Sequence, residues 1–220
     1  YPQVSESMAM TGTVIGKYQI REVLGHGGMG VVYLAEDRNL RRQVAIKLVK
    51  PSVGEVDDYF RRFRREARAV ASLSHPNIVH INSFDVVDGQ FVIEMPYVDA
   101  GSLSGAMRRG LTVSGFTRLL ADCLSALSAC HDAGVVHRAV KPGNILISSD
   151  GRAMLTDFGV AALMDSEWTA STQSGIATST LMGTPRYLSP GAWDGEPPAP
   201  HHDLYSLGLI AYEMFMGAYP

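Results

Sequence analysis

The first part of the chain is patterned mostly for strands. Tyr18–Leu34 predicts a strand, a glycine-rich turn and a second strand, and Gln43–Val49 is a β-branched run typical of another strand. Val79–Phe84 and Gln90–Met95 have the pattern of strands, with a hairpin signal at Asp88-Gly89 between them. This part of the chain is therefore expected to be rich in strands.

One helical pattern interrupts these strands. Apolar residues recur three and four positions apart, which predicts an amphipathic helix. They are Val56, Phe60, Phe63, Ala67, Val70 and Leu73. The strand-rich character ends near residues 96–101, where we expect a boundary.

Helical spacing dominates the remainder. Phe116–Ala133 predicts a long helix that ends at Gly134. Two short apolar strands, Ile145–Ile147 and Ala153–Leu155, are expected to follow it. Asp203–Met216 predicts a last helix that is apolar on nearly every side, which is typical of a buried helix.

Composition narrows the class of protein. The 220 residues suffice for one domain or two small lobes, and 46% hydrophobic with 19% charged residues is ordinary for a globular chain. The net charge of −3 argues against a nucleic-acid partner, because such a surface repels phosphates. No apolar run reaches membrane-spanning length, and residues 1–15 predict an irregular tail rather than a signal peptide.

The two cysteines indicate a reducing compartment. Cys123 and Cys130 lie two turns apart on a predicted helix, roughly 10 Å, which is beyond the reach of a disulfide. We therefore expect a cytoplasmic location. The chain starts at Tyr1 rather than at methionine, so a membrane anchor elsewhere in a longer protein stays open.

A glycine-rich segment points to phosphate binding. Gly25–Val32 has the spacing G-x-G-x-x-G-x-V, which also occurs in dinucleotide folds. A dinucleotide fold needs a helix directly after the glycines, whereas Val31–Leu34 has the composition of a strand. The segment is therefore expected to fold back as a hairpin whose backbone approaches phosphates closely.

A lysine on the next strand strengthens this interpretation. Alone, Lys47 at the end of Val44–Lys47 would be an ordinary edge lysine. Glu66 lies on the predicted amphipathic helix, among arginines that are expected to form a solvated face. Pairing with Glu66 would hold the Lys47 ammonium in place to meet two phosphates.

The middle of the chain carries a resemblance to a known family. His137–Asn144 resembles the protein-kinase catalytic loop H-R-D-x-K-P-x-N, and Asp157-Phe158-Gly159 resembles the magnesium motif of that family. Together with the glycine loop and Lys47, these motifs follow the family order over nearly the whole chain. The chain is similar to bacterial eukaryotic-like (Hanks-type) serine/threonine protein kinases.

The resemblance implies a fold and a partner class. The expected fold is α+β and two-lobed: an irregular tail over residues 1–15, a small lobe over 16–97 with an antiparallel sheet and one helix, and a mainly helical large lobe over 98–220 that lacks its last helices. The expected activity is transfer of the ATP γ-phosphoryl group to serine or threonine hydroxyls of protein substrates.

The resemblance also implies the ligands of ATP and Mg²⁺. The residues implied in binding ATP are Leu24, Gly25, Gly27, Gly30, Val32, Ala45, Lys47, Glu66, Met95, Pro96, Val98 and Leu146. The glycines would cover the phosphates, Met95 would be the gatekeeper, and the Pro96 carbonyl and Val98 N–H would bond the adenine. Asn144 and Asp157 would hold Mg²⁺, and Lys141 would lie near the transferred phosphate.

His137 is implied as a structural residue rather than a base, tied to Asp203 and to the loop of Asp157. Thr178, Ser179 and Thr180 lie in a segment, residues 165–182, that predicts a mobile loop. They are the candidate regulatory phosphosites, with Arg138 as the cation that receives the phosphate. The alternative is a flexible polar loop without modification.

Two positions depart from the family pattern. Ala139 stands where the family has the catalytic aspartate, and Gly191 stands where a glutamate usually ends the activation segment. The favoured hypothesis is an active kinase inactivated by a deliberate Asp→Ala replacement. The alternative is a natural pseudokinase that uses nucleotide as a ligand; a purely structural scaffold has weaker support, because Lys47, Asn144 and Asp157 have no structural need to occur together.

The last predicted helix completes the expectations. In the family, helices beyond it cover part of its surface, and the glutamate absent at position 191 pairs with an arginine there. We expect the uncovered faces of Asp203–Met216 to form an apolar patch that a second copy of the chain or a partner protein covers.

Overall fold

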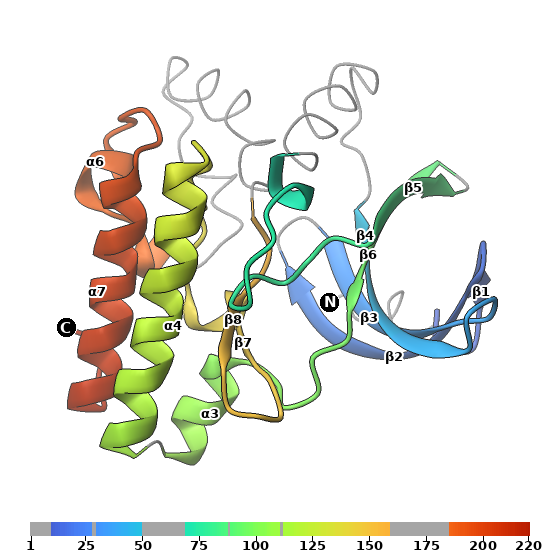
Figure 1. Ribbon diagram of the computed structural model, residues 1–220, viewed down its shortest axis with the longest axis horizontal. Coiled ribbons are helices and arrows are strands. Elements are labelled where there is room, and N and C mark those ends of the chain that lie inside the picture. The colour runs from blue at the N-terminus through green and yellow to red at the C-terminus, as the bar shows by residue number, and fades with distance from the viewer. Residues whose placement is uncertain (1–9, 28–29, 50–68, 88, 111, 159–184) are drawn as a thin grey trace. The chain divides into compact units, whose positions relative to one another are not determined.

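Alternating buried and exposed residues build one curled antiparallel sheet. The computed structural model describes residues 10–27, 30–49, 69–87, 89–110, 112–158 and 185–220 (Figure 1). These residues group into two compact units, the first ending at Tyr97 and the second comprising residues 69–79 and everything from Val98 onward. Each unit is described by itself.

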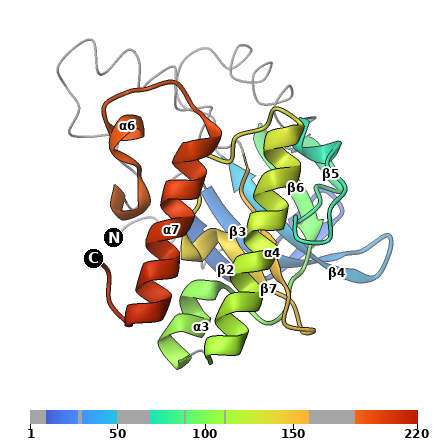
Figure 2. The same ribbon diagram turned by 60° about the vertical axis from the view of Figure 1, so that its left-hand side comes forward.

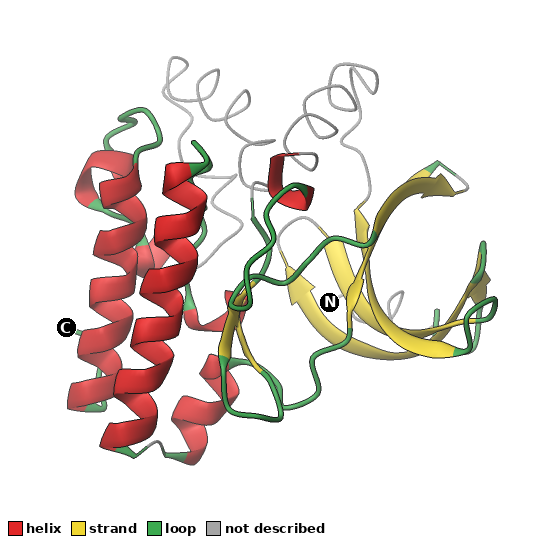
Figure 3. Ribbon diagram, viewed as in Figure 1, coloured by secondary structure: helices red, strands yellow, loops and turns green. Residues whose placement is uncertain are grey.

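The first unit is the sheet. Its strands are β1 (Val14–Ile15), β2 (Tyr18–Gly27), β3 (Gly30–Asp37), β4 (Arg42–Val49), β5 (Ser83–Val87) and β6 (Gln90–Pro96). They lie in the order β1-β2-β3-β4-β6-β5, and every neighbouring pair is antiparallel (Figure 3). The predicted glycine-rich hairpin, the β4 strand and the turn between β5 and β6 are confirmed.

One predicted strand begins in the wrong place. The pattern placed a strand at Val79–Phe84, whereas β5 begins at Ser83. The backbone of Ile78 and Val79 pairs instead with Leu155 in the second unit, and the Val79 N–H donates to the Leu155 carbonyl at 2.8 Å. An apolar pair that looked like the start of one strand is therefore held by a partner 76 residues away.

One face of the sheet carries the core of the first unit. Its buried side chains are Ile15, Tyr18, Ile20, Tyr33, Ala35, Val44, Ile46, Leu48 and Val92. They alternate along β3 and β4 because successive side chains point to opposite faces. The buried carboxylate of Glu94 accepts hydrogen bonds from Tyr18 Oη at 2.7 Å, from Lys17 Nζ at 3.1 Å and from Arg42 at 2.7 Å.

The second unit is mainly helical. Its elements are α3 (Leu103–Arg109), α4 (Val113–Asp132), η1 (Pro142–Asn144), β7 (Ile145–Ile147), β8 (Ala153–Leu155), η3 (Pro185–Tyr187), α6 (Pro190–Trp193) and α7 (Pro200–Met216). The helices α4 and α7 lie side by side (Figures 1 and 2). The two predicted short strands pair with each other as a hairpin.

Caps decide where the long helices begin and end. The side chain of Thr112 accepts from the Gly115 N–H, so α4 starts three residues before the predicted Phe116. Pro200 starts α7 three residues before the predicted Asp203, and Gly217 ends it in the left-handed conformation with φ 72°. The pattern did not predict α3, which Ser102 caps.

Two predictions lie largely outside the described residues. Of the amphipathic helix predicted over Val56–Leu73, residues 69–71 are described and are helical. The predicted loop over residues 165–182 is not described. No helix in the described ranges combines the length and the apolar character needed to cross a membrane.

Candidate functional site

The sheet face opposite the core carries the predicted ATP-binding residues of the first unit. Val32 pairs with Lys47 across β3 and β4, and Ala45 pairs with Met95 across β4 and β6. Residues directly opposite on antiparallel strands share a face, as do residues two apart on one strand. The register thus brings Val32, Ala45, Lys47 and Met95 onto one face. Leu24, on β2, is 41% exposed.

Lys47 is the unusual member of this face. It is 4% exposed, in the middle of a buried strand. Lysines are almost never fully buried unless their ammonium is paired. Glu66, the partner predicted for it, lies outside the described residues. Lys47 is nonetheless too buried to be an ordinary edge lysine.

The structure gives a reason for glycine at position 30 that the spacing of the motif alone did not reveal. A Cβ at this position would lie 1.9 Å from the Leu48 carbonyl oxygen, so β3 approaches β4 too closely for any side chain. A Cβ at Gly25 would meet nothing within 4 Å. One glycine of the loop is therefore demanded by the sheet, whereas Gly25 leaves open space that a ligand can use.

In the second unit, a buried carboxylate holds the loop that contains Ala139. Asp203, on α7, is 1% exposed. Its two oxygens accept the backbone N–H groups of His137 and Arg138, each at 2.8 Å. Arg138 adopts φ 65°, a left-handed conformation that costs a non-glycine residue energy and is common at functional sites.

The His137 side chain links this loop to the segment that leads to Asp157. It is fully buried, with Nε2 3.0 Å from the Thr156 carbonyl oxygen and Nδ1 3.3 Å from the Ala139 nitrogen. The ring therefore donates at Nε2 and accepts at Nδ1. Burial lowers the pKa of His137, although the nearby Asp203 charge opposes this, so the neutral ring persists. The structural contacts predicted for His137 are present.

Asn144 and Asp157 are brought together through the backbone. The Asn144 carbonyl accepts the Thr156 N–H at 3.0 Å, which holds Asn144 beside the residue that precedes Asp157. The Asn144 side-chain N–H₂ donates to the Ala139 carbonyl at 2.9 Å, so the amide oxygen is left for another partner. Asp157 adopts φ 65°. An amide oxygen and a carboxylate are hard ligands and fit Mg²⁺.

Ala139 itself presents only a methyl group. Its N–H and its carbonyl are both held by neighbours, His137 and Asn144. Lys141 precedes the short helix η1 as its N-cap residue. This loop can position backbone and a metal ligand, but it has no group at position 139 that accepts a proton.

One supporting residue was missed by the sequence interpretation. Asn77 is 5% exposed, its side chain donates to the Ala153 carbonyl at 2.8 Å, and its own carbonyl accepts the Leu155 N–H at 2.8 Å. It thereby holds β8 just before Asp157. The sequence signal that could have indicated Asn77 was a polar residue between His75-Pro76 and the apolar pair Ile78-Val79. Glu66, Thr178, Ser179 and Thr180 lie outside the described residues.

Comparisons with known proteins identify the family to which this chain belongs. The family model described as protein kinase domain matches residues 18–220. The chain therefore belongs to the protein kinase family. The relatives it resembles within that family are bacterial serine/threonine protein kinases.

Three relatives illustrate the similarity. PknD, a serine/threonine-protein kinase of Mycobacterium tuberculosis, is 35% identical over 99% of this chain and 32% of its own length. PrkC of Bacillus subtilis is 37% identical over 94% of this chain and 31% of its own length. The PknI kinase domain of M. tuberculosis matches in structure with a TM-score of 0.72 at 28% identity, over 96% of this chain and 78% of that one. The chain thus spans about a third of the length of PknD and PrkC.

Proposed function

We propose that this chain binds ATP with Mg²⁺ and that Ala139 leaves it with little or no transfer of phosphate to serine and threonine hydroxyls of proteins. The observation that carries the proposal is the pairing of Asn144 with the segment of Asp157, which is assembled although position 139 lacks its carboxylate. When bound, Mg²⁺ supplies charge neutralisation on the phosphate oxygens.

The residues of this chain would divide the remaining work. Lys47 would hold the α and β phosphates as a point charge, under the backbone of Gly25, Gly27 and Gly30. Lys141 would lie near the transferred phosphate. The adenine would lie in an apolar slot formed by Leu24, Val32, Ala45 and Leu146, with Met95 as the gatekeeper. The Pro96 carbonyl and the Val98 N–H would complete its recognition.

Titration calorimetry with a non-hydrolysable ATP analogue and Mg²⁺ tests the proposal. We expect binding by the unaltered chain and weaker binding by Lys47→Ala, because the substitution removes the cation that faces the phosphates. Arg152→Ala is the control, since it removes an exposed cation from the turn between β7 and β8. Absence of binding at millimolar analogue, or equal affinities of all three proteins, would contradict the proposed site.

A second candidate function is that of a natural pseudokinase, which binds nucleotide as a signal without using it. One observation favours it. The chain departs from the family pattern at a second position, Gly191, as well as at Ala139. Restoring an aspartate at position 139 separates the two hypotheses.

Regulation and partners follow from the same proposal. Thr178, Ser179 and Thr180 are proposed phosphosites of an active form, with Arg138 receiving the phosphate. Mass spectrometry of the Ala139→Asp variant after incubation with ATP and Mg²⁺ should find phosphate within residues 165–184. An active variant that stays unmodified there would refute this regulation.

The proposed partners are protein substrates and a second copy of this chain, which would cover the exposed apolar face of α7. The proposed location is a reducing compartment. Cys123 and Cys130 are both free and buried, and burial raises the pKa of each thiol to about 12, which keeps both protonated and unreactive.

A further inference from the structure

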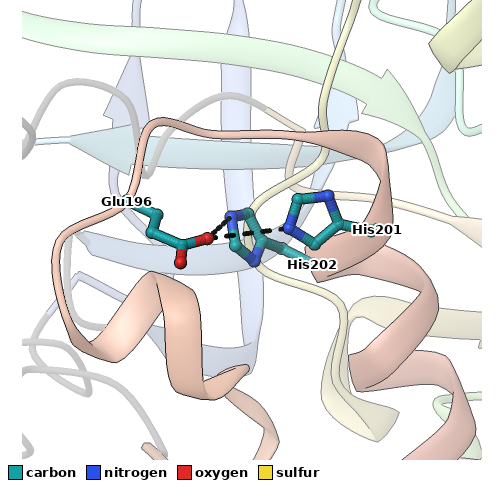
Figure 4. A group of neighbouring side chains, drawn as sticks. All are labelled: Glu196, His201 and His202. Atoms are coloured by element: carbon teal, nitrogen blue, oxygen red, sulfur yellow. Dashed lines mark ion pairs between the residues drawn. The ribbon is translucent and has the colours of Figure 1, made fainter.

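Three side chains that the kinase reaction does not use converge between α6 and α7. Glu196 lies in the loop before α7, and His201 and His202 lie in the first turn of α7 (Figure 4). The Glu196 Oε2 atom is 3.8 Å from His201 Nε2 and 3.9 Å from His202 Nε2. All three potential ligand atoms lie within 4.8 Å of one another.

The ring of His202 is held by a contact of the kind that orients histidines at metal sites. Its side chain is 8% exposed, and its Nδ1 lies 2.5 Å from Ser189 Oγ. A histidine that binds a metal through one nitrogen usually donates the N–H of the other to an oxygen, which fixes the ring. Here Ser189 is that oxygen, and it is itself fixed because it accepts the Ala192 N–H at 3.2 Å.

This orientation gathers electron-rich atoms around one point. With Nδ1–H donating to Ser189, the lone pair of His202 Nε2 faces the Glu196 carboxylate and the Pro197 carbonyl, whose oxygen is 3.2 Å away. Three acceptors in such proximity are stabilised by a cation. In the other tautomer, Ser189 donates to Nδ1 and Nε2–H donates to Pro197, which satisfies the ring without a cation. Metal titration distinguishes these two states.

Gly191 makes room for the carboxylate of this cluster. A Cβ at this position would lie 2.3 Å from Glu196 Oε2, and the Glu196 N–H donates to the Gly191 carbonyl at 2.9 Å. Any side chain at position 191 would therefore displace the carboxylate. The second departure from the family pattern, glycine in place of glutamate, is thereby connected to the two histidines.

We propose that Glu196, His201 and His202 bind a divalent first-row transition metal, with Zn²⁺ as the best fit. Two imidazoles and one carboxylate with an open position for water form a characteristic zinc ligand set, whereas Mg²⁺ prefers oxygen ligands alone. Ligand atoms around tetrahedral Zn²⁺ lie about 3.4 Å apart, given Zn–N and Zn–O bonds near 2.1 Å. The side chains of Glu196 and His201 are 57% and 68% exposed, so both are free to move the short distance required.

Zinc binding by the whole 220-residue chain tests the site. Equilibrium dialysis against Zn²⁺ is performed in millimolar Mg²⁺, which competes for the oxygen ligands proposed at Asn144 and Asp157. We expect one Zn²⁺ per chain, and Co²⁺ substituted for it should show the visible absorption of a site with nitrogen ligands. His201→Ala and Glu196→Gln should each lower the affinity at least about tenfold. His80→Ala removes an exposed histidine elsewhere and should change nothing.

Gly191→Ala is the sharpest variant, because it keeps all three ligands. Its Cβ meets only the far end of the flexible, exposed Glu196 side chain, so the melting temperature without metal should be unchanged. The Zn²⁺ affinity should nevertheless fall about tenfold, since the carboxylate is displaced. Absence of stoichiometric Zn²⁺ in the unaltered chain would overturn the proposal. Equal affinities in the Gly191→Ala, His201→Ala and His80→Ala proteins would overturn it as well.

Discussion

At the scale of single residues, the loop around Ala139 keeps its shape without the side chain that the family uses there. The backbone of position 139 is held by His137 and Asn144, and the preceding N–H groups are held by Asp203. None of these bonds involves a side chain at position 139. The loop is therefore expected to accept one without rearrangement.

We predict that Ala139→Asp raises phosphotransfer by about 10²–10⁴-fold, the usual contribution of a positioned proton acceptor. The measurement is transfer of labelled phosphate from ATP to a generic protein substrate. Ala139→Asn is the matched control, because it has a similar size and no basic carboxylate, and it should stay inactive. An inert aspartate variant that still binds ATP would favour the pseudokinase.

The glycine loop allows a second prediction at this scale. Gly30→Ala should lower the free energy of unfolding by about 1–3 kcal/mol, because its Cβ would lie 1.9 Å from the Leu48 carbonyl oxygen and force the strands apart. Gly25→Ala is the control, since its Cβ meets nothing within 4 Å and it should leave stability nearly unchanged. Urea denaturation followed by circular dichroism compares them. Equal losses for both variants would show that the strand contact is not the cause.

At the scale of elements, charged groups tie the strands of the sheet together. Glu94 on β6 accepts from Lys17 in the turn between β1 and β2, and from Arg42 at the start of β4. Lys17 also pairs with Asp37 at the end of β3, at 3.0 Å. Glu94 and Asp37 are buried, and buried carboxylates of this kind are tolerated only with several partners.

This network predicts loss of stability in acid. Burial raises the pKa of both Glu94 and Asp37, but the hydrogen bonds that each carboxylate accepts outweigh this effect, so both pKa values are lowered. Glu94 accepts from Tyr18, Asn82 and Lys17. Asp37 accepts chiefly from Lys17. The unfolded chain then binds more protons, so the free energy of unfolding falls as the pH drops from about 5 through the lowered pKa values.

Urea denaturation at about pH 7 and pH 3 measures this loss. Glu94→Gln should lower the free energy of unfolding at about pH 7 by ~1.5–3 kcal/mol, the usual contribution of hydrogen bonds to a charged group. It should also reduce the difference between the two pH values. Glu36→Gln is the control, because its ion pair with Arg21 is exposed and contributes little. If Glu94→Gln leaves the pH dependence intact, the network is not its source.

At the scale of the whole molecule, the helix α7 is only partly covered. Leu207 and Ile210 are buried, whereas Phe215 is 69% exposed and Met216 58% exposed. Leu204, Tyr205 and Tyr212 are exposed as well. The prediction of a buried helix therefore holds for one stripe of α7 only, the side that packs against α4 and η3 and holds the loop before Ala139 through Asp203.

We predict that the 220-residue chain self-associates through this face, since contiguous apolar surface of this kind is usually covered. Light scattering at several concentrations should show a mass that rises with concentration. The double variant Phe215→Ser with Met216→Ser should shift the chain toward monomer. Leu40→Ser removes an apolar side chain that is 61% exposed in the first unit and should have no effect. A strictly monomeric chain at high concentration would contradict the prediction.

Spacing along the chain was enough to predict most strands, the two long helices and the order of the motifs. Alternation, glycine spacing and caps act between residues a few positions apart, so they are visible in the sequence. The family resemblance then supplied the expected roles of Lys47, Asn144 and Asp157. The register of β3, β4 and β6 adds that Val32, Ala45, Lys47 and Met95 share one face of the sheet.

Other features depend on contacts that spacing along the chain does not reveal. The start of β5 moved because Val79 pairs with Leu155, and Gly30 is required because β3 passes close to Leu48. The cluster of Glu196 with two histidines forms because α6, its following loop and α7 fold back on one another, and because Gly191 leaves space for a carboxylate. Spacing along the chain does not show which backbone or side chain approaches a residue in space, so these contacts were decided only by the tertiary structure.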